Sequence, residues 1–172
     1  MLQRDDVDEV WFVVSPQNPL KERATLLADE ERLAMVRRAI GDHDGFRVCD
    51  IEMHLPVPSY TVVTLAALGE RYPDRQFCLI MGGDNLATFT RWREYQHILD
   101  NYRILVYPRP GSEHPDLAAH GSVTMVDVPM MDISSSYIRE EIAAGRDVRY
   151  LLTDPVYRYL RERRLYERKD KI

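Results

Sequence analysis

Three consecutive serines followed by an arginine form the segment of the sequence that is best suited to chemistry. Ser134, Ser135 and Ser136 lie where a helix is predicted to begin, and Arg139 lies about one turn inside it. Free backbone N–H groups, hydroxyl donors and a guanidinium together favour an anion, most naturally a phosphate group. One serine would be enough to cap the helix, so the triplet predicts a binding site. The alternative is a plain serine cap with Arg139 in solvent.

Two glycines and an aspartate follow a predicted buried strand. Gly82 and Gly83 would let a ligand approach the backbone closely, and Asp84 can accept hydrogen bonds from ribose hydroxyls or cap a helix. The spacing matches neither a Walker loop nor GxGxxG. A simple tight turn between strand and helix would explain the same residues.

Two further side chains are candidates for ligand contacts. Trp92 lies between two arginines and can offer its face to a flat ring, although a tryptophan that covers the core is the more common case. Lys21 ends a loop with two prolines, residues 15–21, that follows a predicted strand. A lysine there can hold a phosphate as a point charge, or it can simply be solvated.

These residues need a scaffold in which strands and helices alternate. Runs of β-branched and aromatic residues predict strands at 9–15, 46–53, 77–81, 103–107 and 123–128. Apolar spacing predicts helices at 28–40, 59–72, 84–99 (in one or two pieces) and 134–144, another helix after an Asp154-Pro155 cap, and an irregular loop at 108–120. We therefore expect an α/β fold with a doubly wound, mainly parallel sheet and with ligands at the carboxyl ends of its strands.

The composition is typical of a globular protein. The chain has 172 residues, of which 45% are hydrophobic and 30% charged, and this excludes disordered, collagen-like and coiled-coil proteins. We expect a single domain over 1–172, with 146–172 as its C-terminal helical part. The longest apolar run near the start, 10–14, is too short for a membrane span or a signal peptide, so a cytoplasmic protein is predicted.

Several other kinds of site find little support. A formal net charge of −5 disfavours nucleic acid as a partner, although the tail from Val156 is basic. Cys49 and Cys78 are predicted to be buried thiols. No metal site is predicted, because the five histidines show neither HExxH nor i, i+4 pairing: His43, His54, His97, His114 and His120. No acyl-transfer site is predicted, because the sequence has no GxSxG motif and neither cysteine has a histidine at a fixed spacing.

Taken in order, the motifs resemble those of the bacterial nicotinate mononucleotide adenylyltransferases, within the HxGH nucleotidyltransferases. Phosphopantetheine adenylyltransferases share the serine-rich motif, but the Pro58-Ser59-Tyr60-Thr61 segment looks like the nicotinate type. The resemblance covers nearly the whole chain. It rests on five ordered segments: 9–12 leading to 15–21, 58–61, 82–84 with Trp92, 133–139 and 150–157.

The resemblance implies a Rossmann-like nucleotidyltransferase that forms deamido-NAD and pyrophosphate from ATP and nicotinate mononucleotide, with Mg²⁺ assisting. It implies that ATP contacts Gly82, Asp84, Ser134, Ser136 and Arg139, and that the mononucleotide contacts Lys21, Thr61 and Trp92. The alternatives are a noncatalytic nucleotide-binding protein of the same fold and a related adenylyltransferase such as the phosphopantetheine type. The choice of nicotinate over nicotinamide and the oligomeric state stay open, with a homo-oligomer among the options.

The sequence departs from the family pattern in one respect. Family members begin with a strand and a loop of the type GxFxPxHxGH, and no such sequence occurs in this chain. We therefore expect that the first, central strand of the sheet is missing, that the catalytic residues are not in this sequence, and that an HxGH loop is encoded upstream. The chain as given is then expected to show at most a trace of activity.

Overall fold

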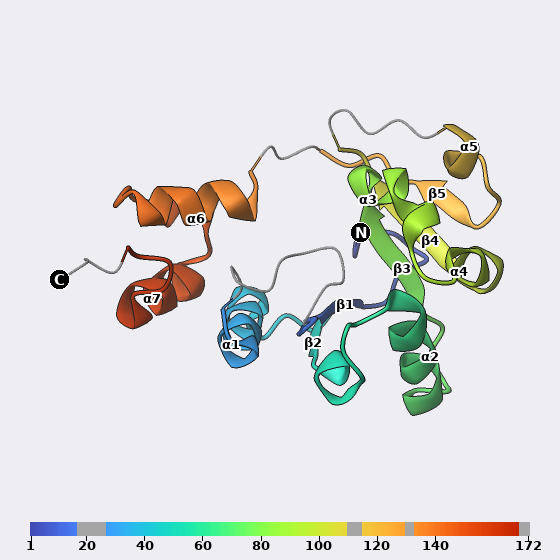
Figure 1. The fold of residues 1–172 in the computed structure, drawn as a ribbon, viewed down its shortest axis with the longest axis horizontal. Coiled ribbons are helices and arrows are strands. Elements are labelled where there is room, and N and C mark those ends of the chain that lie inside the picture. The colour runs from blue at the N-terminus through green and yellow to red at the C-terminus, as the bar shows by residue number, and fades with distance from the viewer. Residues whose placement is uncertain (17–26, 110–114, 130–132, 169–172) are drawn as a thin grey trace. The chain divides into compact units, whose positions relative to one another are not determined.

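The computed structural model describes residues 1–16, 27–109, 115–129 and 133–168 (Figure 1). The chain is divided into two compact units. The terminal unit comprises Met1–Val14, Thr25–Asp50 and Met131–Ile172, and the central unit comprises Ser15–Ala24 and Ile51–Met130.

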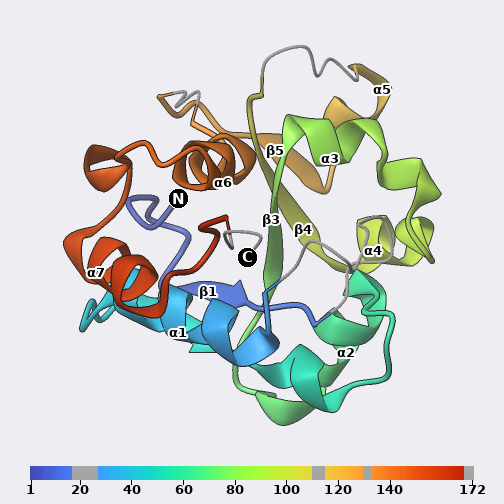
Figure 2. The same ribbon diagram turned by 60° about the vertical axis from the view of Figure 1, so that its left-hand side comes forward.

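The central unit contains a parallel sheet of three strands (Figure 2). Its strands are β3 (Cys78–Gly82), β4 (Arg103–Tyr107) and β5 (Val123–Met125), in that order. In β4, three successive residues from Ile104 to Val106 are completely buried. Parallel sheets carry helices on their faces, and a strand buried on both faces needs a continuous apolar run such as this one. Gly82 pairs with Tyr107, so β3 and β4 end together.

Short helices pack around this sheet and form the core of the unit. Val62 and Leu65 from one helix and Ile98 from another are buried against Met81 and Ile104 of the strands. The helical segments of the unit are η2 (Ile51–His54), α2 (Thr61–Arg71), α3 (Gly83–Ala87), η3 (Phe89–Arg91), α4 (Tyr95–Asn101) and α5 (Pro115–Ala118).

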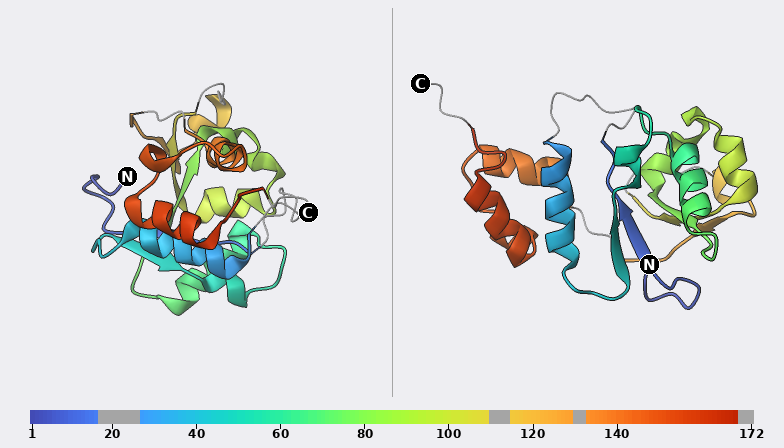
Figure 3. Two further views of the ribbon diagram at one scale, coloured as in Figure 1. Left: turned by 90° about the vertical axis from the view of Figure 1, so that its left-hand side faces the viewer. Right: turned by 90° about the horizontal axis from the view of Figure 1, so that it is seen from below.

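The terminal unit has a two-stranded parallel sheet of β1 (Val10–Val13) and β2 (Phe46–Cys49). Its helical segments are α1 (Asp29–Ile40), α6 (Ser135–Ala143), η4 (Arg149–Leu151) and α7 (Asp154–Arg163). Helices α1 and α7 lie side by side (Figure 3). The Tyr159 hydroxyl donates a hydrogen bond to Glu31 across this contact at 2.5 Å, and Arg163 pairs with the same carboxylate.

The structure confirms the predicted α/β class with parallel strands, and all five predicted strands are present. The strand predicted at 46–53 covers only Phe46–Cys49 in the structure. Its partner β1 ends at Val13, opposite Cys49, and a 3₁₀ turn follows at Ile51–His54. Cys49 is buried as predicted, whereas Cys78 is only half-buried, which corrects the prediction for that residue; neither forms a disulfide with another described residue.

Two helix predictions and one loop prediction need correction. The helix predicted at 84–99 is divided into α3, η3 and α4. The backbone leaves the helical conformation at Thr88 after α3, and Glu94 is left-handed (φ 52°) before α4. The loop predicted at 108–120 contains the short helix α5. Thr153, not Asp154, is the residue before α7, and Pro155 lies in the first turn, where its missing N–H costs no helical hydrogen bond.

Candidate functional site

Glycine at position 82 makes room for three side chains at the carboxyl ends of β3 and β4. A Cβ atom on Gly82 would collide with Asp84 Oδ1 and would lie 3.3 Å from both Arg109 and Tyr107. The Asp84 carboxylate therefore folds back over the backbone of the strand end. This is the edge at which parallel sheets bind ligands.

Arg109 is a member of this group that the sequence analysis missed. It lies two residues beyond β4, and its guanidinium lies 5.6 Å from the centre of the Tyr107 ring. The sequence did offer one signal for Arg109, its position just after a predicted buried strand. The structure shows why that position matters: Tyr107, at the end of the strand, pairs with Gly82. The Asp84 carboxylate and the aliphatic part of the Arg109 side chain thus flank Gly82.

The chemistry of the first turn of α2 suits an anion. Tyr60 precedes the helix in an extended conformation and makes no side-chain cap, and the first turn has no acidic residue. Within the described part of the chain, the backbone N–H groups of Thr61 and Val62 have no acceptor. Unpaired N–H groups and the positive end of the helix dipole favour negative charge at this point.

Trp92 lies near the start of α2, at the edge of the core. Its neighbour Arg93 places its guanidinium 4.9 Å from the centre of the Tyr60 ring. The Trp92 ring packs against the core, 5.2 Å from Phe89, and its Nε1 is buried without a hydrogen-bond partner among the described residues. Thr61 and Trp92, two of the residues predicted for one ligand, are therefore in the same region of the central unit.

Glu52 of η2 and Thr64 of α2 form a buried polar pair that the sequence analysis did not single out. Glu52 and Thr64 are 6% and 5% exposed, and Thr64 Oγ1 donates a hydrogen bond to Glu52 Oε1 at 2.6 Å. Glu52 Oε2 and Ser59 Oγ are buried, and neither has a partner in the part of the chain that is described. The only signal in the sequence was a charged residue inside a run predicted as a strand.

In the terminal unit, the serine-rich segment begins α6 as predicted. Ser134 is the N-cap residue, and its Oγ accepts a hydrogen bond from the backbone N–H of Tyr137 at 3.1 Å. The Arg139 guanidinium donates to Ser136 Oγ at 3.0 Å, so it turns back toward the start of the helix. All three serines are exposed, which leaves the hydroxyl groups accessible.

Arg139 is half-buried rather than simply solvated. Its guanidinium lies 5.9 Å from the centre of the Tyr166 ring. Burial raises the pKa of the Tyr166 hydroxyl above its ordinary value, while the positive charges of Arg139 and Arg32 lower it. The aromatic ring and Ser136 together hold the guanidinium near the first turn of α6.

The predicted site residues are divided between the two units. Thr61, Gly82, Asp84 and Trp92 belong to the central unit, whereas Ser134, Ser136 and Arg139 belong to the terminal unit. Lys21 lies outside the described residues.

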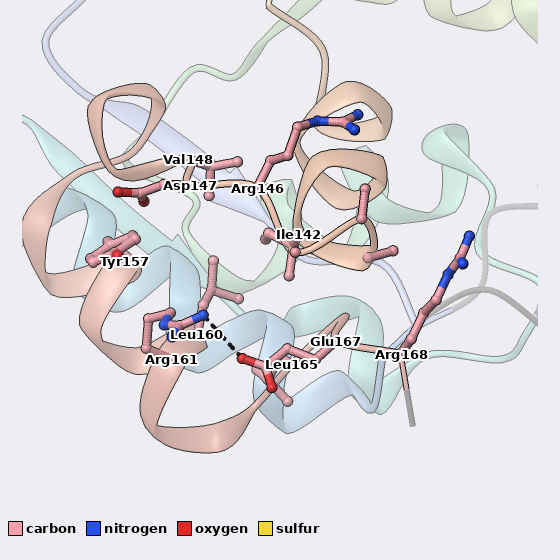
Figure 4. A pocket seen from close by; sticks show the side chains of 13 residues that line it. Ile142, Arg146, Asp147, Val148, Tyr157, Leu160, Arg161, Leu165, Glu167 and Arg168 are labelled. Carbon is pink, nitrogen blue, oxygen red and sulfur yellow. Dashed lines mark hydrogen bonds and ion pairs between the residues drawn. The ribbon is translucent and has the colours of Figure 1, made fainter. Parts of the chain in front are cut away.

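A cavity of about 690 Å³ lies between α6 and α7 (Figure 4). Its lining is mixed: Ile142, Val148, Leu160 and Leu165 contribute apolar side chains. An ion pair of 3.3 Å joins Arg161 to Glu167 at its wall. None of the predicted site residues that the structure describes lines it.

Two classes of feature are absent from the ranges that the structure describes. No group of three or more His, Cys, Asp or Glu side chains could hold a metal ion there. Nor does any helix in those ranges combine the length and the apolar character needed to span a membrane.

Comparisons with known proteins give a consistent assignment. The model of the cytidylyltransferase-like family matches residues 1–141. A probable nicotinate-nucleotide adenylyltransferase of Flavobacterium johnsoniae is 44% identical over 170 residues, which cover 98% of this chain and 88% of that protein. The probable nicotinate-nucleotide adenylyltransferase of Bacteroides fragilis is 47% identical over 154 residues, with 90% and 77% covered.

A solved structure has the same fold at low sequence identity. The nicotinic acid mononucleotide adenylyltransferase of Plasmodium falciparum, complexed with NaAD, has a TM-score of 0.78 to this chain at 18% identity. The match covers 95% of this chain and 85% of the Plasmodium protein.

Proposed function

Because the chain belongs to the cytidylyltransferase-like family and, within it, to the nicotinate-nucleotide adenylyltransferases, we propose that it transfers the adenylyl group of ATP to nicotinate mononucleotide. The products are deamido-NAD and pyrophosphate, and the reaction is a step of NAD biosynthesis. The observation that carries this function is the 44% identity over 98% of the chain to a relative of that name.

The reaction needs no nucleophilic side chain. A phosphate oxygen of the mononucleotide attacks the α-phosphorus of ATP, a new P–O bond forms, and the bond from the α-phosphorus to the pyrophosphate oxygen breaks. Catalysis then depends on holding the two substrates in line and on stabilising the charge that develops on the phosphates. Mg²⁺ would arrive with ATP as part of the substrate, in keeping with its preference for phosphate oxygens and water over all-protein cages.

We assign the ATP phosphates to the start of α6. Ser134, Ser136 and Arg139 offer hydroxyl groups and a positive charge at a helix N-terminus, and this combination suits a polyphosphate. Gly82 and Asp84 are assigned to the adenosine portion, because Asp84 can accept hydrogen bonds from ribose hydroxyls and Gly82 leaves the backbone accessible.

The mononucleotide is assigned to the start of α2. The free N–H of Thr61 suits the nicotinate carboxylate, and the nearby ring of Trp92 suits the flat pyridine ring. Lys21 remains the candidate for the mononucleotide phosphate. Since ATP is an intracellular substrate, we place the reaction in the cytoplasm.

Binding and turnover of the 172-residue chain test this function. Calorimetry compares nicotinate mononucleotide with nicotinamide mononucleotide and phosphopantetheine, and chromatography follows the formation of deamido-NAD from ATP. We expect binding of ATP and nicotinate mononucleotide. Because no HxGH motif occurs in the sequence, we expect turnover at least ~10²–10³-fold slower than that of a family member with the motif, the loss expected when one such donor is removed.

Each alternative predicts a different result. A noncatalytic nucleotide-binding protein would bind ATP and form no deamido-NAD even when the protein is as concentrated as the substrate. A phosphopantetheine-type enzyme would bind phosphopantetheine in preference to the pyridine mononucleotides. Binding of neither ATP nor nicotinate mononucleotide would reject the proposed function.

A further inference from the structure

We propose that Glu52 is a positioning residue for the mononucleotide, and that it acts through Thr64 on the first turn of α2. The proposal rests on the proposed function, in which the backbone of Thr61 contacts the nicotinate carboxylate. It adds a residue that touches no substrate and sets the position of the groups that do.

Burial of Glu52 is costly and is not explained by stability. Glu52 is 6% exposed, and its Oε1 accepts a hydrogen bond of 2.6 Å from Thr64 Oγ1. The other oxygen, Oε2, is buried without a partner among the described residues. Buried charged groups with incomplete hydrogen bonding destabilise a protein, and apolar residues of similar volume are often at least as stable there. A function that needs this carboxylate would account for the cost.

The hydrogen bonds of Thr64 connect Glu52 to the start of α2. The backbone N–H of Thr64 donates to the carbonyl oxygen of Tyr60 at 3.1 Å, and Thr64 Oγ1 lies 3.3 Å from the same oxygen. The N–H of Val63 also donates to it, at 2.9 Å. Tyr60 is the residue from which the helix begins, so the Glu52 carboxylate holds the side chain that completes this first turn.

Side-chain packing is the other constraint on the first turn, because Val62 is buried in the core and Tyr60 packs against it. Tyr60 makes no side-chain cap, and the N–H groups of Thr61 and Val62 have no acceptor in the ranges described. These are the N–H groups that would bind the carboxylate. A small rotation of the turn would move both of them, and hydrogen bonds weaken steeply when donor and acceptor are misaligned. Glu52 and Thr64 would therefore control the affinity for the mononucleotide without contact with it.

Calorimetry with nicotinate mononucleotide and with ATP, on the 172-residue chain below its melting temperature, tests the proposal. Thr64→Val removes the hydroxyl and keeps the shape, and we expect the mononucleotide Kd to rise about 3–10-fold, as for the loss of one hydrogen bond, with the ATP Kd changed by less than about twofold. Thr64→Ser restores the hydroxyl and should return the mononucleotide Kd to within about twofold of the original. Glu52→Asp keeps the charge but draws the carboxylate away from Thr64, so it should also raise the mononucleotide Kd selectively, and it serves if Thr64→Val does not fold.

Leu68→Ala is the matched control. Leu68 is 4% exposed and lies on α2 beyond the first turn, so its truncation should lower the melting temperature and leave both Kd values unchanged. The positioning role is wrong if Thr64→Val leaves the mononucleotide Kd unchanged, raises both Kd values equally, or has the same effect as Leu68→Ala. Failure of the unaltered chain to bind nicotinate mononucleotide would instead reject the proposed function on which the role rests.

Discussion

At the scale of single residues, Arg139 provides the sharpest test of the ATP assignment. The 3.0 Å hydrogen bond to Ser136 and the Tyr166 ring hold its guanidinium at the start of α6. We expect Arg139→Ala to weaken ATP binding by about 1.5–3 kcal/mol, the usual range for a hydrogen bond to a charged group, or about 10–150-fold in Kd. Calorimetry with ATP measures this change.

Arg146→Ala provides the comparison for Arg139→Ala. Arg146 follows α6, and its guanidinium is paired with Glu141 at 2.5 Å. Its removal should leave the affinity for ATP unchanged. An Arg139→Ala protein that binds ATP as tightly as the original would exclude this segment from the ATP site.

Trp92 tests the assignment of the pyridine ring. Its position at the edge of the core means that truncation to alanine would disturb packing as well as binding, so Trp92→Leu is the better substitution because it keeps apolar volume. Stacking of a base on an aromatic side chain contributes ~1–3 kcal/mol, so we expect the mononucleotide Kd to rise by at least about fivefold. Phe89→Leu, at a fully buried neighbour, should lower the melting temperature without a change in that Kd. Equal effects of the two substitutions would mean that Trp92 is a core residue only.

At the scale of elements, the carboxylate of Glu31 on α1 contacts two side chains of α7. The Tyr159 hydroxyl donates to Glu31 and Arg163 pairs with it, and these hydrogen bonds lower the pKa of Glu31 below its ordinary value of 4.5. The hydrogen bond to Glu31 raises the pKa of Tyr159 above its ordinary value of 10.0. The Arg38 guanidinium lies 3.9 Å from the centre of the Tyr159 ring and holds the ring from the other helix.

These shifts predict a loss of stability at both ends of the pH range. The folded state favours ionised Glu31, so this contribution is present above pH 4.5 and is lost as the pH falls through the lowered pKa. The folded state also favours protonated Tyr159, so that contribution is present below pH 10.0 and is lost as the pH rises through the raised pKa. Tyr159→Phe should reduce both losses, as measured by urea unfolding at a series of pH values.

Tyr157→Phe is the control for this experiment. Tyr157 lies on the same helix, and its hydroxyl has no hydrogen-bond partner among the described residues. Its substitution should leave the pH dependence as it was. If the two phenylalanine variants behave alike, the contact between Tyr159 and Glu31 does not hold α1 against α7.

At the scale of the whole molecule, binding of the mononucleotide should raise the melting temperature. A ligand that binds only the folded state at about 100 times its Kd stabilises it by about 2.7 kcal/mol. For a chain of this length, that corresponds to about 5–11 °C. Scanning calorimetry with nicotinate mononucleotide measures the shift, and ribose 5-phosphate with free nicotinate at equal concentration is the control. A shift of the same size with the control mixture would argue against recognition of the mononucleotide as a unit.

Local chemistry in the sequence was enough to predict most of the elements and part of the site. The β-branched runs predicted all five strands, because a covered parallel strand needs continuous apolar residues. Ser134 was predicted to begin a helix, because a serine oxygen can accept the free N–H groups of the first turn. The ordered motifs predicted the family, which the comparisons confirm.

Contacts between residues far apart in the sequence were decided by the tertiary structure alone. Strand β2 ends at Cys49 because its partner β1 ends at Val13. The residues at 46–53 carry no information about the position at which β1 ends. Arg109 lies beside Gly82 because β3 and β4 end in register. The burial of Glu52 depends in the same way on helix α2, which supplies Thr64. Such contacts leave no local periodicity, because each depends on where another part of the chain lies in space.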